Sequence, residues 1–342
     1  MVSVIIPTYN EEKYIEKCLL SIVNNDFPKD KLEVLVIDGG SQDKTREIIF
    51  YFCKKYPFIK FLNNPFRTQV VAFNMGVRES KGDVIIIISS HAEYPKDYIS
   101  KLAGWLKDAK ADVVGGMWKI KPGSNTLVAR SISEALCSSF GIGNIKYRLG
   151  TEKPTYVDTV PYGAYKRSIL NSVGLFDEHF DFAGEDAEIN FRISRNGGKI
   201  LLVPDVYSVY YARPTLSKLG RQYFNYGLSK PLIFEKHKAL PSWRHFVPPA
   251  FVGSLIISLV LSVIYRPFLW LFLFILGSYI IANLAFSLKI FLKKGFRFFF
   301  VLPLVFATLH LSYGIGYLKG IWDFIILKRH KKKKIEHMPR TR

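Results

Sequence analysis

Polar groups that can bind metal or phosphate follow directly on a strongly apolar run at residues 84–88. The run consists only of valine and isoleucine, which is typical of a strand buried on both faces. The polar residues after it are Ser89, Ser90, His91 and Glu93. A parallel strand that ends in this way places them at the carboxyl edge of the sheet, where open α/β sheets bind ligands.

A carboxylate also follows the apolar run at residues 34–37. Asp38 stands before Gly39 and Gly40. It can accept hydrogen bonds from a ribose or a base, and the two glycines let the backbone approach a ligand closely. The alternative is that Asp38 belongs to a turn that caps the next helix.

Two more acidic positions lie where predicted helices begin. Glu11 follows the first apolar run, and Glu185-Asp186 follows Gly184. Each can serve in binding or catalysis. Each can also be a first-turn acid that the helix dipole favours, so the residues alone leave both readings open.

The elements that position these groups alternate along the chain. The patterns predict strands at residues 2–10, 34–38, 58–62, 84–88, 113–120 and 199–203. They predict helices at residues 11–23, 44–56, 68–79, 98–107, 168–173, 185–196 and 218–226. This alternation over the first hundred residues indicates an α/β fold with right-handed crossovers and a parallel sheet.

Three uncharged runs follow, and each has the length of about 20 residues that a membrane-spanning helix needs. They lie at residues 246–265, 268–288 and 298–318. The alternative, core helices of a soluble domain, would require three such runs in succession. We therefore expect a catalytic domain at 1–235, a membrane domain at 236–327 and a basic tail at 328–342.

The loop between the second and third runs carries Lys289, Lys293, Lys294 and Arg297. By the positive-inside rule this loop is cytoplasmic, and so is the N-terminal domain. A third span would place the lysine-rich tail outside, against the same rule. Either the third run is re-entrant or interfacial, or the rule fails here.

The formal net charge of the 342-residue chain is +20. A basic tail beside apolar runs fits a membrane surface better than nucleic acid, for which no motif is present. Cys18, Cys53 and Cys137 have neither metal nor redox spacing. We expect a reducing compartment for the soluble part and no cleaved signal peptide.

Several blocks together resemble the inverting glycosyltransferases of family 2, which have the GT-A nucleotide-diphospho-sugar transferase fold. These blocks lie at residues 4–11, 36–45, 72–76, 81–83, 174–178 and 185–192. Within the family, residues 91–95 and 310–317 resemble the membrane-bound succinoglycan-type glucosyltransferases of exopolysaccharide assembly.

The resemblance implies roles for individual residues. Asp186 would be the general base for the acceptor hydroxyl, supported by Glu185. The residues around the donor would be Pro7, Tyr9, Glu11, Asp38 and Gly163. Arg167 matches a basic position of the family, and Gln222 with Tyr226-Gly227 loosely matches a donor-closing motif.

Two positions depart from the family pattern. The usual Asp-Asp pair is Asp38-Gly39 here, and the Asp-x-Asp metal motif aligns with Ser89-Ser90-His91. His91 is shared with the close relatives and is the candidate ligand for Mn²⁺ or Mg²⁺, Mn²⁺ being the more tolerant of imidazole. His91 can also be a hydrogen-bonded neutral histidine, or contact the diphosphate without metal.

The resemblance thus implies an inverting transferase that moves a sugar from a nucleotide-diphospho-sugar, most simply UDP-linked, to a polyprenyl-linked glycan. The implied setting is the cell membrane, with several spans, a cytoplasmic catalytic domain, membrane lipids as partners and no nucleic acid. Two alternatives remain: transfer to polyprenyl phosphate itself, and a catalytically inactive membrane scaffold of the same fold.

Overall fold

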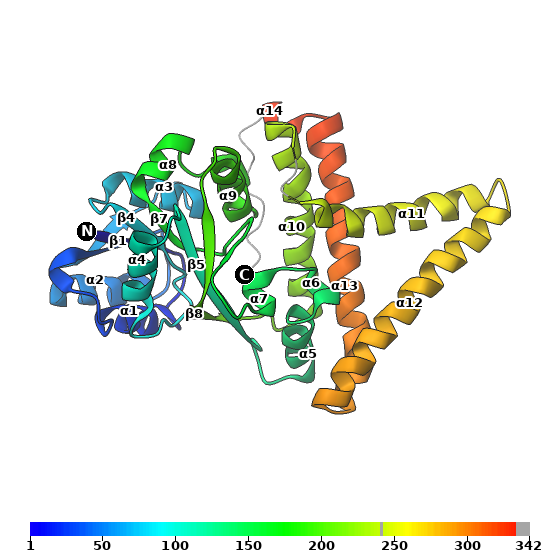
Figure 1. The fold of residues 1–342 in the computed structure, drawn as a ribbon, viewed down its shortest axis with the longest axis horizontal. Coiled ribbons are helices and arrows are strands. Elements are labelled where there is room, and N and C mark those ends of the chain that lie inside the picture. Colours follow the sequence, from blue (N-terminus) through cyan, green and yellow to red (C-terminus); the bar gives the residue numbers. More distant parts are fainter. Residues whose placement is uncertain (240–241, 333–342) are drawn as a thin grey trace. The chain divides into compact units, whose positions relative to one another are not determined.

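The computed structural model describes residues 1–239 and 242–332 (Figure 1). The chain divides into two compact units that alternate along the sequence. The first comprises Met1–Lys119, Lys146–Asp181 and Glu185–Tyr210, and the second comprises Ile120–Ile145, Phe182–Gly184 and the chain from Tyr211 onward. The domain limits at residues 235 and 327 stay predictions.

The first unit is built on an eight-stranded mixed sheet with the order β3-β2-β1-β4-β7-β5-β8-β6. The strands are β1 (Val2–Thr8), β2 (Leu32–Asp38), β3 (Ile59–Asn63), β4 (Val84–Ile87), β5 (Val113–Lys121), β6 (Thr155–Tyr156), β7 (Ala164–Lys166) and β8 (Ile200–Tyr211). The first four are mutually parallel, as the alternation predicts. β7 runs antiparallel to both β4 and β5, which makes the sheet mixed.

The apolar runs form β1, β2 and β4 because side chains on both faces of these strands are covered. Ile5, Val36 and Ile86 are fully buried. Four helices connect the strands from β1 to β5 in sequence order: α1 (Ile15–Val23), α2 (Thr45–Lys55), α3 (Gln69–Glu79) and α4 (Tyr98–Asp108). Gly76 of α3 lies against Ile5, where a Cβ would approach the Ile5 side chain to 2.6 Å.

Three further helices belong to the first unit. They are α7 (Lys146–Leu149), α8 (Arg167–Val173) and α9 (Glu185–Arg195). The predicted α/β architecture is confirmed. The strand ends and the acidic residues named above all lie in the first unit.

The second unit is helical. It contains α5 (Leu127–Leu136), α6 (Ser139–Ile142), α10 (Leu216–His237), α11 (Val247–Ser262), α12 (Pro267–Lys294), α13 (Arg297–Gly320), a π-helical segment (Ile321–Ile326) and α14 (Arg329–Lys332). In the described part of the chain, three helical stretches are long and apolar enough to cross a membrane: Trp243–Ser262, Pro267–Lys294 and Arg297–Ile326. They coincide with the three predicted runs and indicate membrane association.

Candidate functional site

The ends of the first strands meet at one edge of the sheet. Thr8 pairs with Asp38, and Asp38 pairs with Asn63. On the other side of β1, Ile5 pairs with Ile87. The loops that follow β1, β2 and β4 therefore leave from the same edge. The ends of these strands and their loops carry most of the predicted donor-site residues.

The loops after β1 and β2 are held together by hydrogen bonds. Asn10 adopts a left-handed conformation, with φ of 53°. Its backbone N–H donates to Ser41 Oγ at 2.8 Å, and its side-chain oxygen accepts from the Gln42 N–H at 2.8 Å. The Glu11 N–H donates to Thr45 Oγ1 at 2.7 Å. These bonds fix the segment that carries Tyr9 and Glu11.

Asp38 organises the turn after β2. Its carboxylate is fully buried and accepts from the Gly40 N–H at 3.1 Å and from Ser41 Oγ at 2.5 Å. Arg46 Nε donates to it at 2.7 Å, and the same guanidinium reaches Asn63 Oδ1. The contacts of Asp38 in the structure are thus those of a turn-forming residue. Its contact with the donor stays a prediction.

Glu11 and His91 lie together although 80 positions separate them in sequence. Glu11 Oε1 is 3.3 Å from His91 Nδ1, and the carboxylate is buried whereas the imidazole is 43% exposed. Ser89 Oγ lies 3.1 Å from Nδ1 and 3.2 Å from Nε2 of the same ring. Helix α1 begins only at Ile15, so Glu11 stands before the helix and faces the end of β4.

The Ser89 backbone is held by the phenol of Tyr94. The Ser89 N–H donates to the Tyr94 hydroxyl at 2.8 Å, and this hydroxyl donates to the Ser89 carbonyl at 3.2 Å. Burial strongly raises the pKa of Tyr94, so its hydroxyl keeps the proton that this double contact requires. The Cys18 thiol also donates to the Ser89 carbonyl, at 3.5 Å.

Replacing Tyr94 with Phe should loosen the turn that presents Ser89 and His91. We expect weaker binding of a nucleotide diphosphate by roughly three- to tenfold, about the net value of one hydrogen bond, measured by calorimetry. Tyr98→Phe is the matched control, because Tyr98 is equally buried and its ring lies 4.7 Å from that of Tyr94. Equal effects of both substitutions would contradict the positioning role of Tyr94.

Glu185 and Asp186 open helix α9, and Asp186 Oδ1 accepts from the Ala187 N–H at 2.7 Å. Burial raises the pKa of the Tyr162 phenol, and the charges of Glu185 and Asp186 raise it further, which places both acids near this ring. Tyr162 has a φ of 38°, an uncommon value for a bulky residue. Such backbone strain often occurs at functional sites.

Gly163 follows Tyr162 and is buried between strands. A Cβ at this position would lie 2.6 Å from the Val114 carbonyl oxygen. The Gly163 carbonyl accepts from the Ile87 N–H at 3.1 Å. Close packing explains the glycine, and its role beside the donor sugar stays a prediction. Its position joins β4 to the residue that lies near Asp186.

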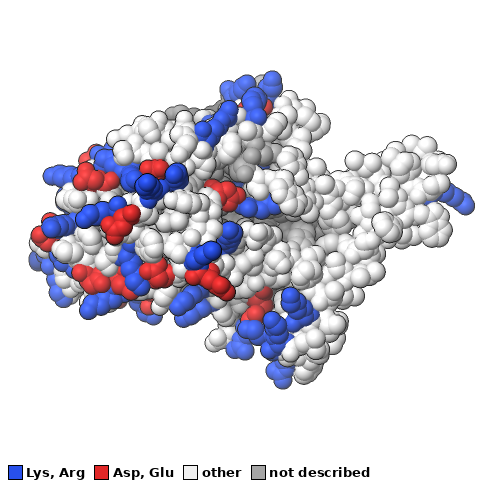
Figure 2. Space-filling view, in the orientation of Figure 1, with Lys and Arg blue, Asp and Glu red and all other residues white. Residues whose placement is uncertain are grey.

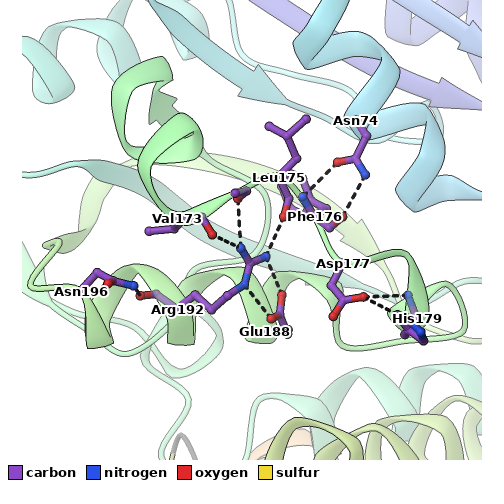
Figure 3. A network of polar contacts seen from close by, with 10 residues as sticks. Asn74, Val173, Leu175, Phe176, Asp177, His179, Glu188, Arg192 and Asn196 are labelled. Carbon is purple, nitrogen blue, oxygen red and sulfur yellow. Dashed lines mark hydrogen bonds and ion pairs between the residues drawn. The ribbon is translucent and has the colours of Figure 1, made fainter. Parts of the chain in front are cut away.

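Helix α9 is fixed by Arg192 (Figure 3). The guanidinium binds the Glu188 carboxylate through two hydrogen bonds, of 2.7 and 2.8 Å. It also donates to the carbonyls of Val173 and Leu175, at 2.6 and 2.8 Å. The segment 173–175 is thereby tied to the helix whose first turn carries Asp186.

The same block has a second anchor on α3. Asn74 donates to the Phe176 carbonyl at 2.9 Å and accepts from the Phe176 N–H at 2.9 Å. Figure 3 shows Asn74 facing Phe176 on the side away from Arg192. Arg167, in contrast, donates to the carbonyls of Gly82, Val77 and Ser80, which makes it a packing residue of the sheet.

Arg67 is a residue that the sequence did not indicate. It has a φ of 59° and is exposed. Its Cα would lie 3.5 Å from a Cβ on Gly39, and its guanidinium would lie 3.4 Å from a Cβ on Gly40. Tyr9, half-buried like Pro7, adjoins the same glycine. The positively charged Arg67 side chain therefore lies beside the predicted nucleotide contacts. The loop that carries it has no distinctive sequence signal.

The groups at the end of β4 fit a divalent cation only in combination with a ligand. Among residues 1–239 and 242–332, no three His, Cys, Asp or Glu side chains converge as a metal site. Glu11, His91 and Ser89 supply one carboxylate, one imidazole and one hydroxyl. These are donors that Mn²⁺ accepts, and a diphosphate and water would have to complete the coordination.

The candidate site lies at the carboxyl ends of parallel strands, where open α/β sheets bind their ligands. Residues 3–174 match the family model for glycosyl transferase family 2. The chain belongs to this family and is a glycosyltransferase.

Two curated relatives match almost the whole chain. A dolichyl N-acetyl-alpha-D-glucosaminyl phosphate 3-beta-D-2,3-diacetamido-2,3-dideoxy-beta-D-glucuronosyltransferase of Methanococcus voltae is 32% identical over 94% of this chain and 97% of its own length. The succinoglycan biosynthesis protein ExoA of Rhizobium meliloti is 29% identical over 94% and 95%. The predicted resemblance to the succinoglycan-type proteins is confirmed.

Solved structures share the fold. The mannosyltransferase PcManGT from Pyrobaculum calidifontis, in complex with GDP-Man and Mn²⁺, superimposes with a TM-score of 0.61 at 20% identity, covering 94% of this chain and 87% of that one. S. aureus TarS 1-349 in complex with UDP-GlcNAc gives 0.52 at 19% identity, covering 95% and 91%. At these identities the likeness establishes the GT-A fold alone.

Proposed function

We propose that the protein is an inverting, membrane-bound hexosyltransferase that transfers a sugar from a nucleotide-diphospho-sugar, UDP-linked in the simplest case, to a polyprenyl-linked glycan. The carrying observation is the edge where Glu11, His91 and Ser89 meet beside the Asp38 turn. Open α/β sheets bind ligands at this edge, which supports a donor-diphosphate site there.

Each part of the site has a task in such a reaction. Asp186 removes the proton from the acceptor hydroxyl, which attacks the anomeric carbon from the face opposite the nucleotide. Glu185, beside it in the first turn of α9, supports this base. Pro7, Tyr9, Asp38 and Arg67 border the nucleotide, and Gly163 borders the sugar.

The leaving nucleotide diphosphate develops negative charge, which a positive group must stabilise. His91 would hold a divalent cation, Mn²⁺ or Mg²⁺, with Glu11 orienting the imidazole and Ser89 in place of a carboxylate. Such a cation, when bound, neutralises the diphosphate. The Pyrobaculum structure, which holds GDP-Man and Mn²⁺ on the same fold, supports a divalent cation in general.

The acceptor is proposed from the membrane helices and from the relatives. The name of the Methanococcus enzyme gives a dolichyl-phosphate-linked sugar as its acceptor, which favours a lipid-linked sugar over bare polyprenyl phosphate here. We place the catalytic unit on the cytoplasmic side of the cell membrane, with bilayer lipids around the apolar helices.

Donor binding tests the proposal directly. With Mn²⁺ present, a panel of UDP- and GDP-sugars should contain at least one that raises the thermal midpoint of the full chain. A ligand at 100 times its Kd stabilises by about 2.7 kcal/mol. The active donor should then label a polyprenyl-phosphate-linked sugar and leave bare polyprenyl phosphate unlabelled. No shift with any donor would contradict the transferase assignment.

A further inference from the structure

In the second unit, α13 runs beside α10 and in the same direction (Figure 1). A Cβ on Gly316 would lie 2.1 Å from the Phe224 carbonyl oxygen, and a Cβ on Gly320 would lie 2.7 Å from that of Leu228. From the first contact to the second, the position moves four residues forward in both helices, which means that the helices run in the same direction. Since the backbones touch, α10 covers one side of the C-terminal half of α13.

Helix α10 is unsuited to the hydrocarbon core. Its charged residues are Lys218, Arg221, Lys230, Glu235 and Lys236. Each charge at a bilayer centre costs roughly 2.5–3.5 kcal/mol by insertion scales. Because α10 must stay outside the core, the part of α13 that it touches, residues 308–320, must stay outside as well.

The rest of α13 is too short to cross. Residues 297–307 would extend about 16 Å at 1.5 Å per residue, against a hydrocarbon thickness of about 30 Å. Beyond Gly320 the chain carries Asp323, which is buried and binds Lys319 at 2.6 Å and Arg329 at 2.9 Å. This ion-pair cluster also fits the outside of the core.

The exposed apolar side chains of α13 and the π-helical segment lie on one stripe. They are Phe300, Leu304, Leu311, Ile315, Trp322 and Ile326. Their spacings of four and seven residues keep them on one helix face. Basic residues stand at both ends of the stripe, Arg297 at the start and Lys328 at the end. A helix with one apolar face and basic flanks lies in the bilayer interface.

Helices α11 and α12 are different, because they diverge from α10 and α13 as a hairpin (Figure 1). Apolar residues near the tip of the hairpin are not covered by other parts of the chain: Val263 is 88% and Ile264 83% exposed. Arg266, at the turn, is the one charged residue between 246 and 288. Figure 2 shows the hairpin surface uncharged except at the tip and at the α12–α13 end. The two stretches of 20 and 28 residues can each cross about 30 Å.

We propose that the chain crosses the membrane twice, through α11 and α12. After the second crossing, α13 lies along α10 on the side of the membrane from which α11 entered, with its apolar stripe against the lipid. The α12–α13 turn and the chain after Lys328 then lie on the same side as the first unit. The positive-inside rule is satisfied at both basic segments, which removes the conflict that three spans create. The proposal does not depend on the transferase activity.

Introduced cysteines test this topology in the full chain, with Cys53 and Cys137 replaced by Ser and the fully buried Cys18 kept. The probes are Tyr265→Cys at the hairpin tip, Phe296→Cys at the α12–α13 turn and Lys331→Cys after α13. With a membrane-impermeant maleimide on intact bacterial cells, we expect Tyr265→Cys to be labelled. The other two should be labelled at least tenfold more after lysis than before.

Labelling of Lys331→Cys in intact cells to the level of Tyr265→Cys would show that α13 crosses, and would overturn the proposal. A tip cysteine that no outside reagent reaches would overturn it too, because the hairpin would then not cross. Fusions to the C-terminus keep the natural sequence and serve as the second measurement. Green fluorescent protein should be fluorescent there, and alkaline phosphatase should be inactive; the reverse pair would overturn the proposal.

Discussion

Asp186→Asn is expected to reduce sugar transfer by about 10²- to 10⁴-fold, the usual contribution of a positioned general base. The amide keeps the shape of the carboxylate and can still accept from the Ala187 N–H. It cannot take the proton of the acceptor hydroxyl. Donor binding should therefore persist, and the loss should appear in kcat when transfer to a lipid-linked sugar is measured.

Two comparisons make this test specific. Asp205→Asn removes an acid on β8 whose partners are Lys101 and Trp105, and it should leave transfer nearly unchanged. Glu185→Gln should reduce transfer less than Asp186→Asn does. If Glu185→Gln abolished transfer while Asp186→Asn kept most of it, the two acids would have to exchange roles. If both variants kept full activity, the base would lie elsewhere.

The sequence predicted the strands of the site because their apolar runs report burial directly. The ends of β1, β2 and β4 each carry polar groups, and parallel strands place such groups at one edge. The pairing of Glu11 with His91 could not be predicted, since it depends on the left-handed turn at Asn10 and on the loop that Tyr94 closes. Neither feature has a sequence signal of its own.

Two elements extend beyond their predicted ends for tertiary reasons. Helix α10 was expected to stop before Gly227 but continues to His237. A Cβ at Gly227 would lie 2.1 Å from the Tyr313 carbonyl oxygen. This glycine therefore allows α10 to pack closely against α13, and it does not terminate α10. Strand β8 continues past Pro204 to Tyr211 beside β5, where the Trp118 and Tyr210 rings stack at 4.3 Å.

The same limitation applies to the turn after β2. The sequence pattern allows Asp38 either to bind a ligand or to build the turn, because both roles need a carboxylate before glycines. The contact with Arg46, eight positions later, decides how the carboxylate is used in this structure. Arg67 escaped notice for a related reason: its importance comes from a left-handed backbone that lays it against Gly39.

Arg192→Met should destabilise the first unit by roughly 3–5 kcal/mol, the typical cost of leaving one partner of a buried ion pair uncompensated. Glu188 is fully buried and would lose both of its Arg192 hydrogen bonds. The carbonyls of Val173 and Leu175 would lose a donor as well. For a unit of this size the thermal midpoint should fall on the order of 10 °C, measured by tryptophan fluorescence during heating.

Lys101→Met is the matched control, because Lys101 binds Asp97 in an exposed ion pair, and such pairs contribute about 0–1 kcal/mol. The double variant Glu188→Met, Arg192→Met removes the uncompensated charge. It should recover part of the midpoint, but not all of it, since the carbonyls of segment 173–175 still lack their donor. A fall no larger than that of Lys101→Met would contradict the view that this pair fixes α9. Because Asp186 begins the same helix, transfer by Arg192→Met should also decrease at temperatures where the unit remains folded.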